Sequence, residues 1–354
     1  MHVGLSLLTL FPGRVGGSET NVRGLLAAFA AGPAPERLTV LGNRHVGETY
    51  AGWPVRQVPS YRPGKAALTR FAAMNFGRIY PEIDGREFDL VHYPVTVPVP
   101  AIEGIPRVVT LLDVQHHELP HMFSWAERRF RRWAYDGAAR DAELVITISE
   151  HAKAGIVKHV GVPAERIVVI GLGVDHERFT PEGPRREDLG DYVLYPANLW
   201  PHKNHDRLLA AWRDVDPGLT LVLTGQAYGR TIEHDRVRVL GHVPHEELPA
   251  LYRGARAVVF PSLFEGFGVP VLEAMACGTP VAASDRGALG EVAGDAALRF
   301  DPEDPGAIAR AIGRVTGDDA LRGALRGAGL RRAADFTWRR SAEAHLRAYG
   351  AVTA

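Results

Sequence analysis

The 354-residue chain contains one cysteine, Cys277, so it can form no disulfide within itself. Nothing in its cysteine content requires an oxidising compartment, and we expect a cytoplasmic protein. The chain also lacks an excess of charge of either sign, because 41 Lys and Arg residues balance 41 Asp and Glu residues. Without a global positive field, the composition argues against nucleic acid as a partner.

Long hydrophobic runs are missing as well. The amino-terminal apolar run, residues 3–10, is too short to span a bilayer, has no basic leader and is followed by glycines instead of a cleavage site. We therefore expect it to form a buried strand.

The length and the hydrophobic pattern indicate two α/β domains. At 354 residues the chain exceeds the roughly 250–300 residues at which single cores stop growing, which favours two domains with a cleft between them. Short apolar runs alternate with longer amphipathic runs, a pattern typical of βα units and parallel sheets, and the pattern occurs twice. The expected strands are residues 3–10, 38–41, 90–91, 107–111, 144–148 and 167–170 in the first series, and 192–196, 219–223, 237–240, 257–260, 280–283 and 298–300 in the second.

A Pro and Gly cluster at residues 180–184 separates the two series, and we expect the hinge near it. The predicted domains are residues 1–178 and 179–336. The amphipathic stretch 337–352 is predicted to form a helix that packs back on the first domain.

The segment richest in chemical signals is residues 257–282. An apolar strand ends at Pro261, a loop follows with glycines on both sides of Phe267, and a helical pattern begins at Val269. The amides of the first helical turn are expected to point into the crevice at the strand end, which suits a phosphate group.

Two glutamates, Glu265 and Glu273, flank this turn with seven residues between them. A carboxylate accepts hydrogen bonds, so Glu273 suits the paired hydroxyls of a ribose and Glu265 the hydroxyls of a sugar. The alternative is that both are surface residues whose charge stabilises the start of the helix. For an isolated pair, the spacing favours this simpler interpretation.

The stretch 260–282 as a whole resembles the nucleotide-sugar signature of family 4 retaining glycosyltransferases, which have the GT-B fold of two Rossmann-like domains facing a cleft. Residues 16–19, 146–150 and 169–175 also resemble family segments in order and spacing. The resemblance therefore covers nearly the whole chain and implies a hexosyltransferase that uses a nucleotide sugar.

The resemblance also implies the site. Glu265 would bind the donor sugar, Glu273 the nucleotide ribose, and Lys203 the pyrophosphate, as a compact positive charge. Main-chain atoms near Gly241 would hold the base. The implied donor-binding residues are Gly16, Gly17, Asn198, Lys203, Leu240, Gly241, His242, Gly266, Phe267, Gly268, Val269 and Glu273.

Two positions depart from the family pattern. Many relatives carry an arginine five or six residues before the lysine, where this chain has Asn198 and Ala197, and Arg286 or His202 are candidates for the missing charge. Many relatives also have a histidine where this chain has Leu112.

The D-x-Q-H run that follows Leu112 makes Asp113 and His116 the candidates for positioning the reacting end of the donor. With Glu265 they are the expected catalytic residues.

The mechanism implied by the resemblance is a front-face substitution in which the leaving phosphate departs and the acceptor hydroxyl attacks from the same face. The protein then needs no strong nucleophile, no cofactor and no metal, only amides, Lys203 and a helix dipole to hold the growing negative charge. The nearest carboxylate pair to a metal-binding D-x-D, Asp301 with Asp304, falls in a predicted turn.

The donor and the acceptor are less constrained. The D-x-Q-H and P-H-K-N-H segments resemble mannosyltransferase-type members, which favours GDP-mannose, with UDP-sugars next. The acceptor would be a hydroxyl of a glycan, a lipid-linked sugar or a small molecule. Two alternatives stay open: a nucleotide-sugar 2-epimerase, which should lack the arrangement of Glu265 and Glu273, and a non-catalytic nucleotide-sugar binding protein, suggested by Leu112 and the missing arginine.

Basic residues gather in two parts of the first domain. Residues 49–81 contain five basic residues and no acid, and residues 128–133 combine four arginines with two aromatic residues. One interpretation is contact with an anionic acceptor or with an anionic lipid surface at the inner membrane face. The other is a solvated helix face.

Overall fold

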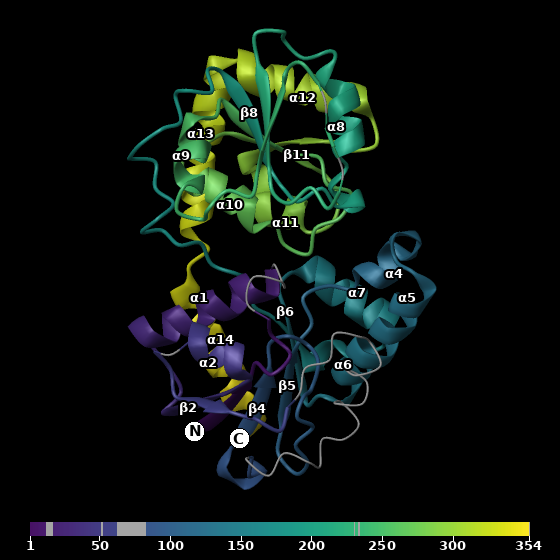
Figure 1. Cartoon of the computed structure of the whole chain (residues 1–354), viewed down its shortest axis with the longest axis vertical. Coiled ribbons are helices and arrows are strands. Elements are labelled where there is room, and N and C mark those ends of the chain that lie inside the picture. Colours follow the sequence, from purple (N-terminus) through teal and green to yellow (C-terminus); the bar gives the residue numbers. More distant parts are fainter. Residues whose placement is uncertain (12–16, 51, 62–82, 230, 233, 354) are drawn as a thin grey trace. The chain divides into compact units, whose positions relative to one another are not determined.

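The computed structural model describes residues 1–11, 17–50, 52–61, 83–229, 231–232 and 234–353, and the chain forms two compact units (Figure 1). Unit 1 comprises Met1–Leu172 and Trp338–Ala354, and unit 2 comprises Gly173–Thr337. The Pro and Gly cluster near which we expected the hinge belongs to unit 2. There Arg253 donates hydrogen bonds to the carbonyl oxygens of Thr180 and Pro184.

Unit 1 is built on a seven-stranded parallel sheet in the order β3-β2-β1-β4-β5-β6-β7. Its strands are β1 (His2–Ser6), β2 (Arg37–Gly42), β3 (Val55–Gln57), β4 (Leu90–Tyr93), β5 (Arg107–Thr110), β6 (Leu144–Thr147) and β7 (Ile167–Val169). Its helical segments are α1 (Gly17–Ala31), α2 (Arg44–Thr49), η1 (Gly85–Glu87), α4 (Gln115–Glu118), η2 (Pro120–Met122), α5 (Trp125–Arg131), the π-helical turn η3 (Arg132–Asp136), α6 (Gly137–Asp141), α7 (Glu150–Val160), η4 (Ala164–Arg166) and α14 (Trp338–Thr353).

Strand β1 is shorter than the predicted strand 3–10. All five of its residues are buried, but the chain turns after Ser6, and the Leu10 N–H donates to the Leu7 carbonyl at 3.0 Å. The Leu7 N–H still donates to the Leu41 carbonyl of β2 at 2.8 Å, and Leu7, Leu8 and Leu10 are buried, but residues 8–10 do not continue the strand. An apolar run thus identified a buried segment whose far end is a turn.

Helix α14 completes the core of unit 1 although it comes from the far end of the chain. It packs on α1, and its residues Ala342, Ala348 and Tyr349 join the cluster around β1 and β2. The contact is close, because a Cβ built on Gly24 would lie 2.1 Å from the Trp338 ring.

Unit 2 is built on a six-stranded parallel sheet in the order β10-β9-β8-β11-β12-β13. Its strands are β8 (Tyr192–Pro196), β9 (Thr220–Thr224), β10 (Val237–Gly241), β11 (Ala257–Phe260), β12 (Val281–Ser284) and β13 (Ala297–Phe300). Its helical segments are η5 (Pro201–Lys203), α8 (His205–Trp212), α9 (Leu248–Gly254), α10 (Val269–Ala276), α11 (Leu289–Ala293), η6 (Gly294–Ala296), α12 (Pro305–Gly317) and α13 (Asp319–Ala334).

The strand order of each unit reverses next to its first strand. In unit 2 the chain proceeds outward from β8 to β9 and β10, then returns to β11 on the other side of β8. Such a reversal opens a crevice at the carboxyl ends of the two central strands, where ligands of open α/β sheets bind. Among the described residues, none of the helices has both the length and the apolar composition needed to cross a membrane.

Candidate active site

The topological switch point of unit 2 brings Lys203 and Glu265 together. Lys203 ends the short turn η5 after β8, and Glu265 lies in the loop after the neighbouring strand β11. The Lys203 Nζ atom lies 2.6 Å from Glu265 Oε1, and the two side chains are only 14% and 12% exposed. A charge-assisted hydrogen bond of this kind fixes both groups at the strand ends.

The turn that carries Lys203 is anchored to the loops after β11 and β13 by the Asn204 side chain and by one backbone hydrogen bond. Asn204 adopts a left-handed conformation with φ of 62°, and its buried amide donates to the carbonyls of Pro261 at 2.9 Å and Pro302 at 2.8 Å. The Leu263 N–H donates to the His202 carbonyl at 2.8 Å. These bonds hold the two loops in register, so the backbone positions of Lys203 and Glu265 do not depend on the ion pair between their side chains.

A glycine on the next loop supports Glu265 from the other side. Gly287 has φ of 61°, and a Cβ built on it would lie 2.7 Å from the Glu265 carbonyl oxygen. The same oxygen accepts a hydrogen bond from the Ala288 N–H at 3.0 Å. This close approach of two backbones requires glycine at position 287.

Helix α10 begins where the sequence predicted, directly after Gly268. That glycine is its N-cap residue, with φ of 108° and ψ of 46°, and Pro270 stands in the first turn. Proline is suited to this position because it removes one of the N–H groups that have no partner at a helix start. The first turn is therefore rigid, and the helix dipole has its positive end there.

Glu273, one turn into α10, is held by a tyrosine from α9. The Tyr252 hydroxyl donates to Glu273 Oε2 at 2.9 Å, and His245 Nε2 lies 3.7 Å from Oε1. Burial, reinforced by the neighbouring Glu273 charge, raises the pKa of Tyr252 well above its usual value, so its hydroxyl stays protonated. One carboxylate oxygen is thus occupied by Tyr252, and the other faces His245.

The other predicted donor-binding residues lie in different parts of the chain. Asn198 uses its Oδ1 to accept the Gln226 N–H at 2.7 Å, which ties the loop after β8 to the loop after β9. Leu240 and Gly241 end β10, with His242 exposed beyond them.

Gly17 is the exposed first residue of α1. Gly16 and the basic residues of the acid-free run beyond Arg56 lie outside the described residues.

Of the two candidates for the missing positive charge, His202 is neutral and Arg286 is paired with carboxylates. Burial, with the positive charge of Lys203 next, lowers the pKa of His202 to about 4, so its ring is neutral at neutral pH. Arg286 lies within 3.2–3.4 Å of carboxylate oxygens of Asp285, Asp301 and Glu303. Among the described residues of unit 2, Lys203 is the cation that forms an ion pair with Glu265.

In unit 1, Asp113 lies just after strand β5. Its Oδ1 accepts the Gln115 N–H at 3.0 Å, which starts the short helix α4. Loss of solvation on burial raises the pKa of Asp113, and the Gln115 hydrogen bond opposes this effect.

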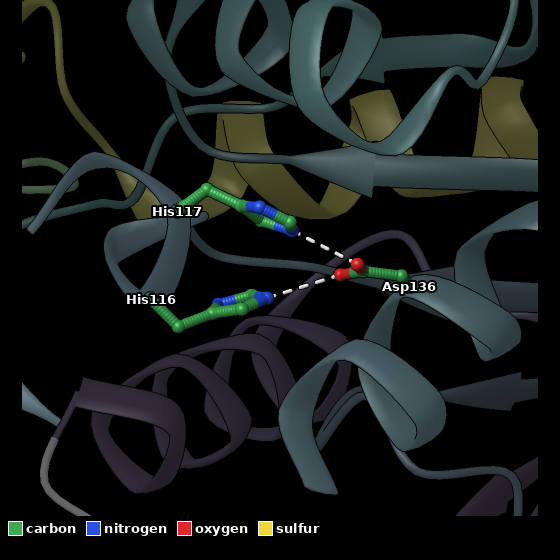
Figure 2. Close-up of side chains that lie close together, drawn as sticks. All are labelled: His116, His117 and Asp136. Carbon is green, nitrogen blue, oxygen red and sulfur yellow. Dashed lines mark hydrogen bonds and ion pairs between the residues drawn. The ribbon is translucent and has the colours of Figure 1, made fainter. Parts of the chain in front are cut away.

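His116 and His117 of α4 converge on Asp136, the last residue of η3, as Figure 2 shows. His116 Nε2 lies 3.0 Å from Asp136 Oδ1, and His117 Nε2 lies 2.8 Å from Oδ2. Burial alone would raise the pKa of Asp136, but hydrogen bonds from both imidazoles hold it below its usual value. Burial lowers the pKa of His117, against the effect of that same hydrogen bond.

Three residues of these clusters were not identified from the sequence. Tyr252 and Asp136 belong to segments without a recognisable motif. His117 lies in the Asp113–His117 run, but only the first histidine of that run, His116, was expected to act. Their partners lie 19 to 21 positions away in the sequence, and local patterns carry no information at that separation.

The chain matches two families of known proteins. Residues 15–178 match the family described as "Glycosyltransferase Family 4", and residues 190–318 match "Glycosyl transferases group 1". O-antigen chain mannosyltransferase B of Escherichia coli is 32% identical over 265 residues, which cover 68% of this chain and 69% of that protein. The chain belongs to glycosyltransferase family 4. This confirms the resemblance seen in its motifs, and the protein is a glycosyltransferase.

Other glycosyltransferases are similar over shorter stretches. D-inositol 3-phosphate glycosyltransferase of Salinispora tropica is 32% identical over 250 residues, which cover 60% of this chain and 52% of that protein. The chain thus spans about half the length of that relative.

Solved structures agree over nearly the whole length. Sucrose-phosphate synthase from Thermosynechococcus elongatus superimposes with a TM-score of 0.80 at 22% identity, covering 99% of this chain and 98% of that chain. HepE from Anabaena, solved with UDP and glucose, gives a TM-score of 0.77 at 21% identity, covering 99% of this chain and 100% of that chain. The prediction of a GT-B fold with two Rossmann-like parallel-sheet domains is confirmed.

Proposed function

We propose that this family 4 glycosyltransferase moves a hexose from a nucleotide sugar to an acceptor hydroxyl, with retention of configuration and without a metal ion. The observation that carries the proposal is the pairing of Lys203 with Glu265 at 2.6 Å on the switch point of unit 2. A cation and a hydrogen-bond acceptor at that position match a pyrophosphate and a sugar, respectively.

The ion pair explains how the site could respond to its donor. The Lys203 ammonium has three hydrogen atoms to donate, and in this structure one is directed at Glu265. A pyrophosphate carries more negative charge than a carboxylate and would compete for the ammonium. Glu265 would then be released to accept hydrogen bonds from the sugar hydroxyls.

Glu273 is suited to the ribose for a related reason. Tyr252 holds Oε2 in place, so the carboxylate cannot rotate freely, and Oε1 is directed away from that bond. A carboxylate fixed in this way can accept a hydrogen bond from a ribose hydroxyl with little loss of side-chain entropy. The first turn of α10, with Phe267 to Val269, is the proposed partner of the phosphate.

The residues proposed in unit 1 differ in how accessible they are. The His116 side chain is 1% exposed and its Nε2 is committed to Asp136. Asp113 is half-buried, so of the two it is the better candidate for direct contact with a substrate, and His116 would act by holding the turn in which Asp113 lies.

We propose GDP-mannose as the donor and UDP-sugars as the second choice. The support is that two similar proteins are named mannosyltransferases, the Escherichia coli protein above and RfbU of Salmonella typhimurium, which is 30% identical over 209 residues. The acceptor would be a glycan, a lipid-linked sugar or a small molecule.

A panel of nucleotide sugars, assayed for nucleotide release and for sugar product, tests the proposal. We expect release with one donor class, and a drop of about 100-fold or more in kcat for Lys203→Ala and Glu265→Ala, the scale seen when one group that stabilises transition-state charge is removed. Lys158→Ala, exposed on α7, is the matched control.

Several outcomes would contradict it. Sugar conversion without nucleotide release indicates an epimerase, and binding without turnover indicates a binding protein. Wild-type turnover by folded Lys203→Ala or Glu265→Ala would remove these residues from the site.

We further propose that α5 and η3 contact an anionic acceptor or an anionic lipid surface, from a cytoplasmic location. Trp125 is 67% exposed and Trp133 is 42% exposed, and the Arg129 guanidinium lies 5.2 Å from the centre of the Trp125 ring. Exposed tryptophans beside arginines are typical of membrane-surface contacts. A solvated helix face is the simpler alternative.

Co-sedimentation with vesicles separates the two interpretations. We expect binding to vesicles that contain phosphatidylglycerol, weaker binding after Trp125→Ala, and none to neutral vesicles. No binding at low salt would remove the membrane interpretation.

A further inference from the structure

The cluster around Asp136 has the composition of a metal site. His116, His117 and Asp136 each offer one ligand atom, and these atoms all lie within 4.8 Å of one another (Figure 2). The transfer chemistry proposed for unit 2 makes no use of His117 or Asp136. Their convergence therefore calls for its own explanation.

We propose that His116, His117 and Asp136 bind one divalent transition-metal ion, zinc by preference, which takes no direct part in the sugar transfer. Two imidazole nitrogens and one carboxylate oxygen form a ligand set that zinc accepts, with water in the fourth position. Calcium and magnesium prefer oxygen ligands and are poorly matched.

The ligand atoms lie near one another, although not yet at the spacing of a formed zinc site. In a tetrahedral zinc site with bonds of about 2.0–2.1 Å, neighbouring ligand atoms lie about 3.3 Å apart. Here the two nitrogen-to-oxygen distances, 3.0 and 2.8 Å, join the imidazoles to different oxygens of Asp136, and the three ligand atoms lie within 4.8 Å of one another. The side chains must therefore rotate to direct one oxygen and both nitrogens at a common point when an ion binds.

Burial favours a cation at this place. The side chains of Asp136 and His116 are 2% and 1% exposed, and that of His117 is 8% exposed. The Asp136 carboxylate charge is therefore shielded from solvent, and both of its oxygens face histidine rings. Arg140 lies 3.9 Å from Asp136 Oδ2, but its own side chain is half exposed. A metal ion would neutralise the enclosed charge from within, and His117 is the most exposed of the three ligands.

The His116 ring can also exchange its hydrogen bond to Asp136 for a bond to a metal ion. An ionised carboxylate only accepts hydrogen bonds, so the His116 proton is on Nε2 in the metal-free cluster. Its Nδ1 is buried and has no hydrogen-bond partner in the described part of the chain. Nothing on Nδ1 therefore fixes this tautomer, and the proton can move there when Nε2 binds a metal.

The lack of a hydrogen-bond partner at His116 Nδ1 also limits the affinity for zinc. Metal-bound histidines usually donate their second N–H to a partner, and such partners change metal affinity by about 10–100-fold. The missing partner of His116 thus predicts micromolar rather than nanomolar binding of zinc.

The backbone places the third ligand by an irregular turn. Asp136 closes the π-helical turn η3, which interrupts the path from α5 into α6. Single π-helical turns within longer helices occur frequently at functional sites, because the extra residue redirects a side chain. Here the turn directs Asp136 toward two adjacent histidines on α4.

Zinc titration of the full-length, untagged chain after treatment with a chelator tests the proposal. We expect isothermal titration calorimetry to show one zinc ion per chain, and saturating zinc to raise Tm by several degrees, as mass action requires for a ligand of the folded state. Cobalt added in place of zinc should give the visible absorption bands of a tetrahedral nitrogen and oxygen site.

Variants assign the binding to these residues. Asp136→Asn keeps the shape of the side chain, and His117→Ala changes the most exposed of the three, so both should fold and lose at least about 10-fold in zinc affinity. His159→Ala is the matched control, since its ring stacks on that of His117 at 5.4 Å but lies outside the cluster.

Two results would overturn the proposal. The first is the absence of saturable binding to the wild-type chain, with no tetrahedral cobalt spectrum; the cluster would then be a hydrogen-bonded network without a metal. The second is binding that persists at wild-type affinity in folded Asp136→Asn and His117→Ala. The wild-type titration and the cobalt spectrum decide the question even if a variant fails to fold.

Discussion

At the scale of single residues, the donor side of unit 2 depends on side chains that hold other side chains. Tyr252 is buried and touches no predicted substrate group, but it donates to the carboxylate assigned to the ribose. We regard it as a positioning residue. Because its hydroxyl donates to a charged acceptor, losing this hydrogen bond costs more free energy than losing a hydrogen bond between neutral groups.

Replacing Tyr252 with phenylalanine should weaken donor binding more than catalysis. The ring still fills its space, but Glu273 Oε2 loses its donor and the carboxylate gains rotational freedom. We expect the KM for the donor to rise about 10-fold, equivalent to the roughly 1.5 kcal/mol of a hydrogen bond to a charged group, with kcat nearly unchanged. Steady-state kinetics on the variant measure both; a lower kcat with an unchanged KM would contradict the positioning role.

Replacing Gly268 with alanine should destabilise unit 2. Gly268 has φ of 108°, and the added Cβ would lie 2.6 Å from Leu289 Cδ2. We expect the free energy of unfolding to fall by about 1–3 kcal/mol, the cost of holding an ordinary residue in such a backbone conformation.

Gly313→Ala is the matched control for this prediction, because Gly313 lies within α12 with nothing within 4 Å of an added Cβ. It should stabilise the same unit by about 0.5–1 kcal/mol, since alanine favours the helix. Urea unfolding measures both variants, and shifts of the same sign would refute the argument.

At the scale of elements, the seam between α14 and the sheet of unit 1 is built from histidines. His92 of β4 contacts the Tyr349 hydroxyl at 2.8 Å and Thr110 Oγ1 at 2.7 Å. The His345 ring lies 5.8 Å from that of His92, and its Nδ1 is 2.8 Å from the Ser341 carbonyl. Burial lowers the pKa of both histidines, to about 4 for His345.

This seam should make unit 1 sensitive to acid. Because the usual histidine pKa of 6.5 is lowered to about 4 at His345 on folding, the unfolded chain takes up a proton between these values while the folded chain does not. The contribution to stability is complete above pH 6.5 and falls as the pH drops toward 4. The loss from this residue is about 3 kcal/mol, at roughly 1.4 kcal/mol per pH unit.

His345→Gln removes that titration. The free energy of unfolding of unit 1, measured in urea at several pH values, should then vary less across this interval by roughly 1.4 kcal/mol per pH unit. His121→Gln, an exposed position of the same unit, should leave the slope unchanged. Equal slopes for wild type and His345→Gln would refute the prediction.

At the scale of the whole molecule, one folding unit is built from two separate stretches of the chain. Unit 1 takes its first 172 residues from the start of the chain and its last helix from the end, while unit 2 is continuous. In α14, Tyr349 and Ala342 are completely buried within the core of unit 1. Unit 1 is therefore incomplete until α14 has been made.

A chain that ends at Thr337 should lose unit 1 and retain unit 2. Each large buried side chain contributes about 1.5–3 kcal/mol, and domains are stable by only about 5–15 kcal/mol, so removing all of α14 exceeds what unit 1 can tolerate. Limited proteolysis should degrade unit 1 and leave residues 173–337 intact. Removing only residues 350–354 is the control, and a protease-resistant unit 1 in the longer truncation would contradict the expectation.

The sequence by itself determined the two series of βα units, the start of α10 at Val269 and the segments that hold Lys203, Glu265 and Glu273. These features are local. An apolar run, a glycine turn or a helical pattern reflects interactions within about ten residues, and the match to glycosyltransferase family 4 follows from the same segments.

Only the tertiary structure decided which side chains meet. Lys203 and Glu265 are 62 positions apart, and Glu273 and Tyr252 are 21 apart, so their contacts depend on the order of strands in the sheet and not on spacing along the chain. The half-buried edge strand β3 was missed because three residues are too few to show a period. The cluster of His116, His117 and Asp136 likewise exists only because a π-helical turn brings a distant carboxylate to two adjacent histidines.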